Sequence, residues 1–313
     1  MTRADDEPEA MLVEEYGSRL RRTEIHLLPG GAFQWTHRPG TDSPVRMAAP
    51  DRALAQAISA CSVPALRWVP ASAGDAGALT YLASSPLSAM SWLDLEQPRT
   101  QQLMATTLEG AGRGLRALHQ LRGPDAASTP PGPRRVARWL DEPGLGPASL
   151  AKLADLAWPR WGRTRLSRLR DWCVPPKEER TLLHGFASLG TLLPPLAIPE
   201  TAAPQGEFLI GSDLAAGRPE SDLGWLLGEL HELHWVGVYP WMDFPTLRRA
   251  LRRGYGPGCD EVAVGRSAVL RLITHLHDFA AYAGWLDEFT GYVDFAAELI
   301  DDEGRRAARG EAA

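Results

Sequence analysis

Residues 182–193 read LLHGFASLGTLL, and residues 207–223 read EFLIGSDLAAGRPESDL. Both stretches hold short apolar runs bounded by glycine or proline, a pattern that predicts strands at 181–184, 191–193 and 207–210. Asp222 then opens a periodic apolar segment, which predicts an amphipathic helix over 222–235. The centre of the chain therefore predicts short strands around a His-Gly loop, followed by an acid-bearing loop and a helix.

Upstream of this centre, the signals predict a small sheet with one helix. Turn dipeptides such as Pro29-Gly30 separate runs of strand-forming residues, and an Asp at position 51 precedes a segment with helical spacing. The pattern predicts a meander of strands at 24–28, 32–38 and 43–48, a helix at 51–61, and further strands at 65–69 and 78–83.

Beyond residue 89 the periodicity is helical, and Pro159 is expected to interrupt or kink one of the helices. The chain therefore predicts a bilobal α+β protein with a small antiparallel sheet plus one helix and a larger, mainly helical lobe. The predicted divisions are an N-terminal extension (1–22), an N-lobe (23–88), a helical C-lobe (89–303) and a disordered tail (304–313).

Composition excludes several classes of function. The 313 residues carry a net charge of −6, which disfavours binding to nucleic acid or to an anionic membrane. Three dispersed cysteines build neither a disulfide framework nor a paired-cysteine metal site, and no apolar run approaches the length of a membrane span. We expect a cytoplasmic protein that binds neither nucleic acid nor membrane.

The central motifs resemble those of the aminoglycoside phosphotransferase and choline kinase families, which have a protein-kinase-like fold. Leu183-His184-Gly185 is similar to the start of their catalytic loop, which reads His-Gly-Asp, four residues, Asn. Asp213 to Leu223 resembles their metal loop and the start of the next helix, and Gly114 to His119 resembles the helix that precedes the catalytic loop. The resemblance covers about residues 23 to 300.

The departures from this pattern fall on residues that phosphoryl transfer requires. Phe186 stands where the family has its catalytic Asp, and Phe cannot accept a proton from an attacking hydroxyl. Thr191 replaces the magnesium-binding Asn, and the metal-binding Asp falls on Ile210 or Gly211. Asp213 lies three residues late. The resemblance implies a degenerate catalytic loop (182–193), a metal-like loop (207–223), and a structural role for His184.

The N-lobe is similarly depleted in cations that could hold phosphate. The only lysines, Lys152 and Lys177, lie outside it, and Arg46 is the one basic residue of the strand expected at 43–48. Arg46 is therefore the candidate substitute for the family's phosphate-binding lysine, with Asp213 as a weak cofactor contact. The helix expected at 51–61 has no Glu to pair with Arg46, so a phosphate-gripping ion pair is not expected.

We interpret the chain as a pseudokinase that serves as a binding, regulatory or scaffold partner. No cofactor is expected, and a protein or peptide partner is. By analogy, its setting is bacterial specialised metabolism, as an accessory protein in a hetero-complex with a peptide-modifying enzyme. One alternative is a divergent phosphotransferase or other nucleotide-using transferase that takes ATP and magnesium through Arg46 and either Asp213 or Asp222. Another is a small-molecule binder without turnover.

Candidate partner contacts come from two aromatic regions. Arginines interleave with tryptophans between positions 158 and 172, and a second aromatic run follows residue 235; the candidates are Arg160, Trp161, Arg165 and Trp241. The competing interpretation of the first region is a helix with buried tryptophans and solvated arginines. His231 and His234 lack the spacing of a zinc protease motif, and no Gly-x-Ser-x-Gly motif marks a serine hydrolase.

Overall fold

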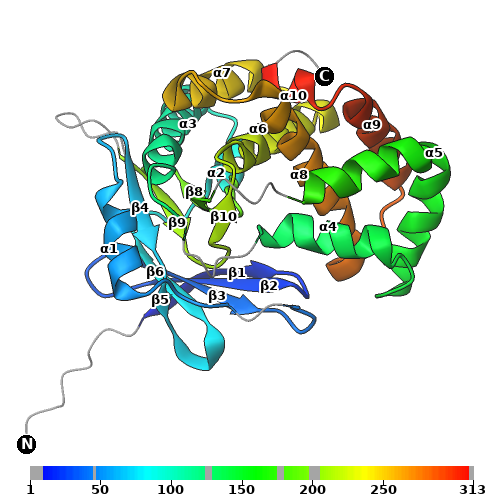
Figure 1. Ribbon diagram of the computed structural model, residues 1–313. Coiled ribbons are helices and arrows are strands. Elements are labelled where there is room, and N and C mark those ends of the chain that lie inside the picture. Colours follow the sequence, from blue (N-terminus) through cyan, green and yellow to red (C-terminus); the bar gives the residue numbers. More distant parts are fainter. Residues whose placement is uncertain (1–9, 45–46, 124–128, 175–179, 197–204, 310–313) are drawn as a thin grey trace, which may run out of the picture.

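The computed structural model describes residues 10–44, 47–123, 129–174, 180–196 and 205–309. A five-stranded antiparallel sheet forms the N-terminal lobe and lies below the larger helical lobe (Figure 1). Its strands, in spatial order, are β1 (Met11–Gly17), β2 (Arg21–Leu27), β3 (Phe33–Pro39), β6 (Leu79–Ala83) and β5 (Ser72–Ala73). One helix, α1 (Arg52–Ala60), flanks the sheet and is capped by Asp51, whose side chain accepts from the Leu54 amide.

Two small sheets shape the central loops, and the first of them also connects the lobes. β4 (Leu66–Pro70) pairs in parallel with β9 (Gly206–Ile210), and β9 pairs antiparallel with β8 (Leu192–Leu193). The second small sheet pairs β7 (Thr181–Leu183) with β10 (Ala215–Gly217). A strand of the N-terminal lobe is thus hydrogen-bonded directly to the strand that leads into the Asp213 loop.

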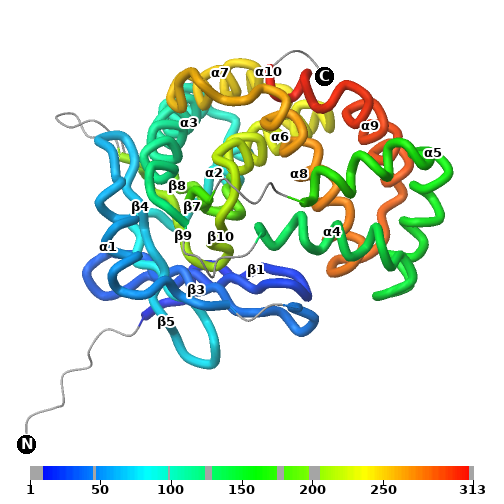
Figure 2. Tube along the Cα trace, viewed as in Figure 1, coloured from blue at the N-terminus to red at the C-terminus, as the bar shows by residue number. Residues whose placement is uncertain are grey.

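The helical lobe contains α2 (Ala89–Leu93), α3 (Pro98–Leu118), α4 (Pro131–Asp141), α5 (Ala148–Cys173), α6 (Glu220–Val236), α7 (Phe244–Tyr255), α8 (Glu261–Tyr282), α9 (Phe289–Asp301) and α10 (Arg305–Arg309). The tube in Figure 2 shows α3 beside α7, and α4 and α5 against α8 and α9. Glycines permit the closest of these contacts. A Cβ at Gly254 would lie 1.9 Å from the Glu109 carbonyl oxygen, so α7 approaches α3 only where a side chain is missing.

The largest core cluster spans both lobes. Ile58 of α1 and Trp68 of β4 pack in the same cluster as Leu108 of α3 and Leu226 of α6. A second cluster fills the space among α4, α5, α8 and α9, and a third lies against the five-stranded sheet. Burial on this scale is the main stabilising contribution to folding.

The predicted bilobal α+β architecture is confirmed, and the helices expected from periodicity are present. The strand expected at 43–48 is wrong, because none of the described residues in that range belongs to a strand. The stretch 1–22, expected as an extension, contains β1, a strand that lacks the usual alternation because every one of its residues is exposed. The tail beyond 304 is helical to Arg309, since Ala307 and Ala308 are buried. No described helix is long and apolar enough to cross a membrane.

Candidate functional site

Asp222 holds the His-Gly loop in place. It sits in the first turn of α6 and is 2% exposed, and its two carboxylate oxygens accept from the backbone amides of His184 (2.7 Å) and Gly185 (3.0 Å). His119, which caps the C-terminus of α3, lies 3.1 Å from the same carboxylate through Nε2 and 2.8 Å from the Tyr255 hydroxyl through Nδ1. Burial alone would raise the pKa of Asp222, but the His119 contact and the amide donors lower it.

The loop itself is held by His184 and Gly185. His184 is 3% exposed; its Nε2 lies 2.9 Å from the Leu209 carbonyl oxygen, and its Nδ1 accepts from the Phe186 amide at 3.3 Å. Burial lowers the pKa of His184, which keeps the ring neutral, as this arrangement requires. Gly185 has φ +81°, and a Cβ there would lie 1.8 Å from the Asp213 carbonyl oxygen. His184 therefore supports the loop, as the sequence predicted.

Phe186 and Thr191, the two departures expected from the motif resemblance, have different surroundings. Phe186 lines the cleft between the lobes, where its ring lies 5.8 Å from Trp225 and beneath the guanidinium of Arg21 at 5.6 Å. Thr191 is 7% exposed, and its hydroxyl lies 3.1 Å from the Ser188 carbonyl oxygen, so it closes a turn and does not face the cleft. Ile210 is buried in β9, and Gly211 has no side chain.

Asp213 is paired across the cleft with Arg21, the first residue of β2. The guanidinium donates to the carboxylate at 2.6 Å, and the Ser212 hydroxyl donates to the same oxygen. The side chain of Asp213 is 11% exposed. Burial alone would raise the pKa of Asp213, but the positive charge of Arg21 outweighs it, so the pKa is lowered and the carboxyl is ionised. Sequence analysis missed Arg21, because its partner lies 192 residues away.

A pocket of about 500 Å³ surrounds this ion pair between the sheet and the helical lobe. Residues of β2, of α4, of the His-Gly and Asp213 loops and of the segment before α1 line it: Arg21, Thr23, Met47, Arg135, Phe186 and Asp213. The β1–β2 turn closes one end, because the Arg19 guanidinium donates to the Ala281 carbonyl oxygen (2.9 Å) at the end of α8. The side chain of Arg46, the cation predicted from the sequence, lies outside the described residues.

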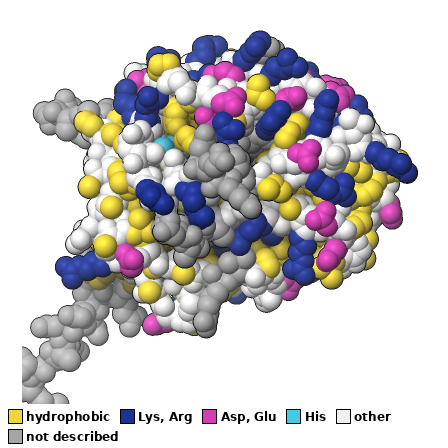
Figure 3. Space-filling model, in the orientation of Figure 1, with side chains coloured by type: hydrophobic (Ala, Val, Ile, Leu, Met, Phe, Trp, Pro, Cys, Tyr) yellow, Lys and Arg dark blue, Asp and Glu magenta, His cyan; other side chains and the backbone are white. Residues whose placement is uncertain are grey.

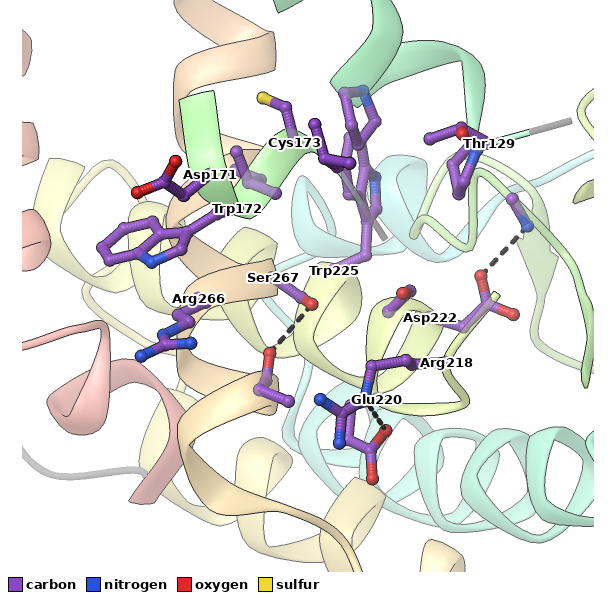
Figure 4. A pocket seen from close by; sticks show the side chains of 17 residues that line it. Thr129, Asp171, Trp172, Cys173, Arg218, Glu220, Asp222, Trp225, Arg266 and Ser267 are labelled. Carbon is purple, nitrogen blue, oxygen red and sulfur yellow. Dashed lines mark hydrogen bonds and ion pairs between the residues drawn. The ribbon is translucent and has the colours of Figure 1, made fainter. Parts of the chain in front are cut away.

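A second, smaller pocket of about 140 Å³ lies behind the His-Gly loop (Figure 4). Asp222 and Trp225 border it from α6, Trp172 and Cys173 from the end of α5, and Ser267 from α8. The indole nitrogen of Trp225 is buried and has no hydrogen-bond partner. The pocket has the size of a small ring, and Asp222 is already fully engaged with the loop.

The arginine and tryptophan region of α5 is a structural helix face. Trp161 is 1% exposed and donates to the Val293 carbonyl oxygen at 2.9 Å, so it is unavailable to a partner. Arg160 pairs with Asp294 at 3.2 Å, and Arg165 pairs with Asp301 at 2.6 Å, both on α9. On the face in Figure 3, basic and acidic side chains are interspersed over the helical lobe. The kink expected at Pro159 occurs at Gly162, where the backbone leaves the helical region.

The other candidate residues also differ in exposure and in their partners. Trp241 is 39% exposed, and its indole donates to the Leu93 carbonyl oxygen at 3.1 Å. His231 is buried beside Arg248, with 2.5 Å between His231 Nδ1 and the guanidinium, whereas Glu232 pairs with Arg271 and His275. No group of three or more His, Cys, Asp or Glu among the described residues is arranged to hold a metal ion.

Comparisons with known proteins confirm the resemblance found in the motifs. The model of the phosphotransferase enzyme family (APH) matches residues 34–185, a stretch that ends immediately before Phe186. No curated protein matches the sequence.

Solved structures share the fold. A microcompartment-associated aminopropanol kinase is 15% identical with a TM-score of 0.52, over 97% of this chain and 94% of its own. Amicoumacin kinase hAmiN, in complex with AMP-PNP, Ca2+ and Ami, is 13% identical with a TM-score of 0.52, over 94% and 88%. Choline kinase LicA from Streptococcus pneumoniae is 10% identical with a TM-score of 0.51, over 93% and 94%. The chain therefore has the protein-kinase-like fold of aminoglycoside phosphotransferases and choline kinases.

Proposed function

We propose that this chain, with its protein-kinase-like fold and phosphotransferase-family resemblance, is a catalytically impaired protein that acts as a binding or regulatory partner. The observation that carries the proposal is the cleft itself. By the motif resemblance, Phe186 takes the place of the general base, and Arg21 and Asp213 neutralise each other beside it. A phosphotransferase needs a base at the first position and a metal-binding carboxylate near the second.

The expected loss of catalysis is large. A positioned general base contributes about 10² to 10⁴ in rate, and the bridging metal contributes much of the remaining stabilisation of the transition state. Phe186 offers neither a proton acceptor nor a metal ligand. Asp222 gives both oxygens to the amides of the His-Gly loop, so recruiting it as a ligand would release the loop from α6. The properties of Phe186 and Asp222 together support the interpretation that the protein retains the kinase-like scaffold but does not turn over a substrate.

From the same premise, a scaffold without catalysis, we also propose the kind of partner. A catalytically impaired scaffold in a cytoplasmic setting suits a complex with a biosynthetic enzyme. By analogy with bacterial specialised metabolism, that enzyme modifies peptides. Trp241 remains a partner-binding candidate because it is partly exposed, whereas the burial of Trp161 and the ion pairs of Arg160 and Arg165 make those three poor candidates.

One observation favours the alternative, a divergent ATP-dependent transferase. Arg21 and Asp213 border a pocket of about 500 Å³, and a cation beside an acid is the chemistry that binds a nucleotide phosphate and a magnesium ion. In that case Arg21 would release Asp213 when nucleotide enters. Because kinases share this fold, the experiment must also distinguish this alternative.

The test is a thermal-shift and calorimetric titration with ATP and a non-hydrolysable analogue, with and without magnesium. A ligand at ten times its Kd stabilises the folded state by about 1.4 kcal/mol, so even millimolar affinity is measurable. We expect no magnesium-dependent shift in the wild type. The matched variants are Phe186→Asp, which restores a carboxylate, and Phe186→Leu, which changes the side chain without adding one.

A magnesium-dependent shift in the wild type, accompanied by ATP turnover, would overturn the proposal and establish the transferase. Binding without turnover would retain catalytic impairment and assign the cleft a regulatory nucleotide. If only Phe186→Asp binds magnesium and nucleotide, the replaced residue is what separates this chain from an active enzyme, and the proposal stands.

A further inference from the structure

The β1–β2 turn, residues 18–20, reaches from the sheet to the end of α8. The Arg19 guanidinium donates to two carbonyl oxygens in the last turn of α8, from Nε to Tyr282 at 3.2 Å and from Nη2 to Ala281 at 2.9 Å. The Arg19 amide also donates to the Tyr282 carbonyl oxygen at 3.3 Å. The last carbonyls of a helix have no partner within the helix and carry partial negative charge, so a guanidinium is a suitable donor for them.

The chain that follows β3 holds Arg19 within reach of α8. The Asp42 carboxylate lies 3.5 Å from the Arg19 guanidinium, and the Asp42 amide donates to the Arg19 carbonyl oxygen at 2.9 Å. The Gly40 amide donates to the Leu20 carbonyl oxygen at 2.9 Å. A Cβ at Gly40 would lie 2.2 Å from the Arg19 carbonyl oxygen, so this close approach requires glycine.

The contacts that hold the turn are polar and open to water. The side chains of Arg19 and Asp42 are 47% and 46% exposed. Residues 18–20 all lie in the described part of the chain, and none of them belongs to the three core clusters. Segments with few buried apolar contacts and exposed hydrogen bonds open locally without unfolding of the whole protein. The turn therefore has the properties of a segment that can leave α8 while the sheet stays folded.

The turn separates two cavities. The pocket of about 500 Å³ that contains Asp213 lies on one side, and a cavity of about 640 Å³ bordered by Tyr282 lies on the other. Residues 16–18 border both cavities. Release of Arg19 from α8 would therefore join the two cavities and widen the entrance to the pocket.

We propose that the β1–β2 turn is a lid over one end of the cleft and that Arg19 holds it closed on the end of α8. When the contacts of Arg19 break, the turn moves away from α8 and the pocket opens to solvent. Because these contacts are electrostatic and exposed, salt weakens them and favours the open lid. This inference goes beyond the proposed function, since it concerns access to the cleft and holds whether or not the cleft binds nucleotide.

Hydrogen exchange of the Arg19 amide measures release of the lid, because the acceptor of this amide belongs to α8. The full chain is compared with Arg19→Ala, with rates corrected for the intrinsic exchange of each residue. Loss of two half-exposed, charge-assisted hydrogen bonds should raise the exchange rate at position 19 about tenfold. Arg19→Lys keeps the charge without the planar fork that reaches two carbonyls, so its rate should lie between the two.

Arg22→Ala is the matched control. Arg22 is also an exposed arginine of this hairpin, but its ion pair with Glu15 lies within the sheet. Its removal should leave exchange at position 19 unchanged. Raising NaCl from about 0.05 M to about 1 M should speed this exchange in the wild type and reduce the difference from Arg19→Ala, because added salt screens the contacts that only the wild type makes.

Met47 reports whether release of the lid opens the pocket. Met47 lines the pocket and is partly buried, whereas Met11 is 59% exposed. The probe is chloramine-T, a bulky oxidant that converts methionine to its sulfoxide, and peptide mass spectrometry follows each residue. In Arg19→Ala we expect oxidation of Met47 to be at least about threefold faster, as more frequent opening requires, and oxidation of Met11 to be unchanged.

Three results would overturn the proposal. Equal exchange at position 19 in the wild type and Arg19→Ala would show that Arg19 does not hold the turn. An equal rise in Arg22→Ala would show general fraying of the hairpin. Faster exchange at position 19 with unchanged oxidation of Met47 would show that the turn moves without opening the pocket.

Discussion

Two buried histidines give the folded protein a defined response to acid. His37 of β3 is 3% exposed and His231 of α6 is 1% exposed. Burial lowers the pKa of each from 6.5 to about 3, and the neighbouring charges of Arg21 and Arg248 act in the same direction. In the unfolded chain both residues take up a proton near pH 6.5. Stability is therefore complete above pH 6.5 and falls as the pH drops toward 3, because only the unfolded state binds these protons.

We predict that the free energy of unfolding, measured by urea denaturation, falls by about 2 kcal/mol per histidine between pH 7 and pH 5. Between pH 7 and pH 5, the pH dependence of the free energy of unfolding comes from histidines and not from the buried carboxylates. The pKa values of Asp213 and Asp222 are lowered from 3.8, so their ionised forms stabilise the fold until the pH falls below that value. The lowered pKa values of His184 and His234 add to the same dependence, so His37→Phe should remove the contribution of one histidine, about 2 kcal/mol, and less than half of the total. If the dependence is the same in His37→Phe and His231→Phe as in the wild type, these residues do not cause it.

Individual residues of the candidate site also show which of its features can be predicted from the sequence. The loop-supporting contacts of His184 were predictable, because this residue lies in a short motif; that Phe186 replaces a catalytic Asp stays a prediction. The Arg21–Asp213 pair was not predictable, because it joins residues from two lobes and depends on how the lobes pack. The predicted phosphate-binding role of Arg46 stays a prediction, and Arg21 and Arg135 are cations that the described structure places in the cleft.

At the scale of elements, helix α5 is interrupted by a backbone conformation that requires glycine. Gly162 has φ +63° and ψ 175°, a region that only glycine occupies readily, and its own Cβ position is open space. We predict that Gly162→Ala lowers the free energy of unfolding by about 1–3 kcal/mol through backbone strain alone. Denaturant unfolding of the purified variant measures this difference.

The matched control is Gly144→Ala, at an exposed position before α5. A Cβ there also meets nothing, but the backbone is not in the left-handed region. Alanine should therefore change stability by less than about 1 kcal/mol, with stabilisation the expected sign. Equal effects of the two substitutions would rule out strain at Gly162 as the cause.

The same distinction explains which elements the sequence predicted. Long helices such as α3 and α8 were predictable, since an apolar face repeats over several turns. β1 was missed because none of its residues is buried, and the segment 43–48 was taken for a strand because local propensity does not reveal whether a pairing partner exists. α10 was missed because its burial rests on two alanines among charged residues.

At the scale of the whole molecule, the two lobes are not independent folding units. β4 of the N-terminal lobe pairs with β9, and Glu207 of β9 pairs with Arg67 of β4 and accepts from the Ser84 amide at 2.8 Å. Leu66 and Trp68 of β4 belong to the core cluster that also contains residues of α3 and α6. Unfolding of the N-terminal lobe alone would expose part of the helical core to water. It would therefore lower the stability of both lobes.

We therefore predict a single thermal unfolding transition, with a calorimetric enthalpy equal to the van't Hoff enthalpy. Leu79→Ala, at a site 2% exposed in the sheet, should cost about 2–5 kcal/mol. If the lobes are coupled, it lowers the Tm reported by the fluorescence of the distant Trp139 and Trp161 by the same amount as the Tm of the sheet. Two resolved transitions, or a sheet that melts before these tryptophans respond, would show that the β4–β9 ladder does not join the lobes into one cooperative unit.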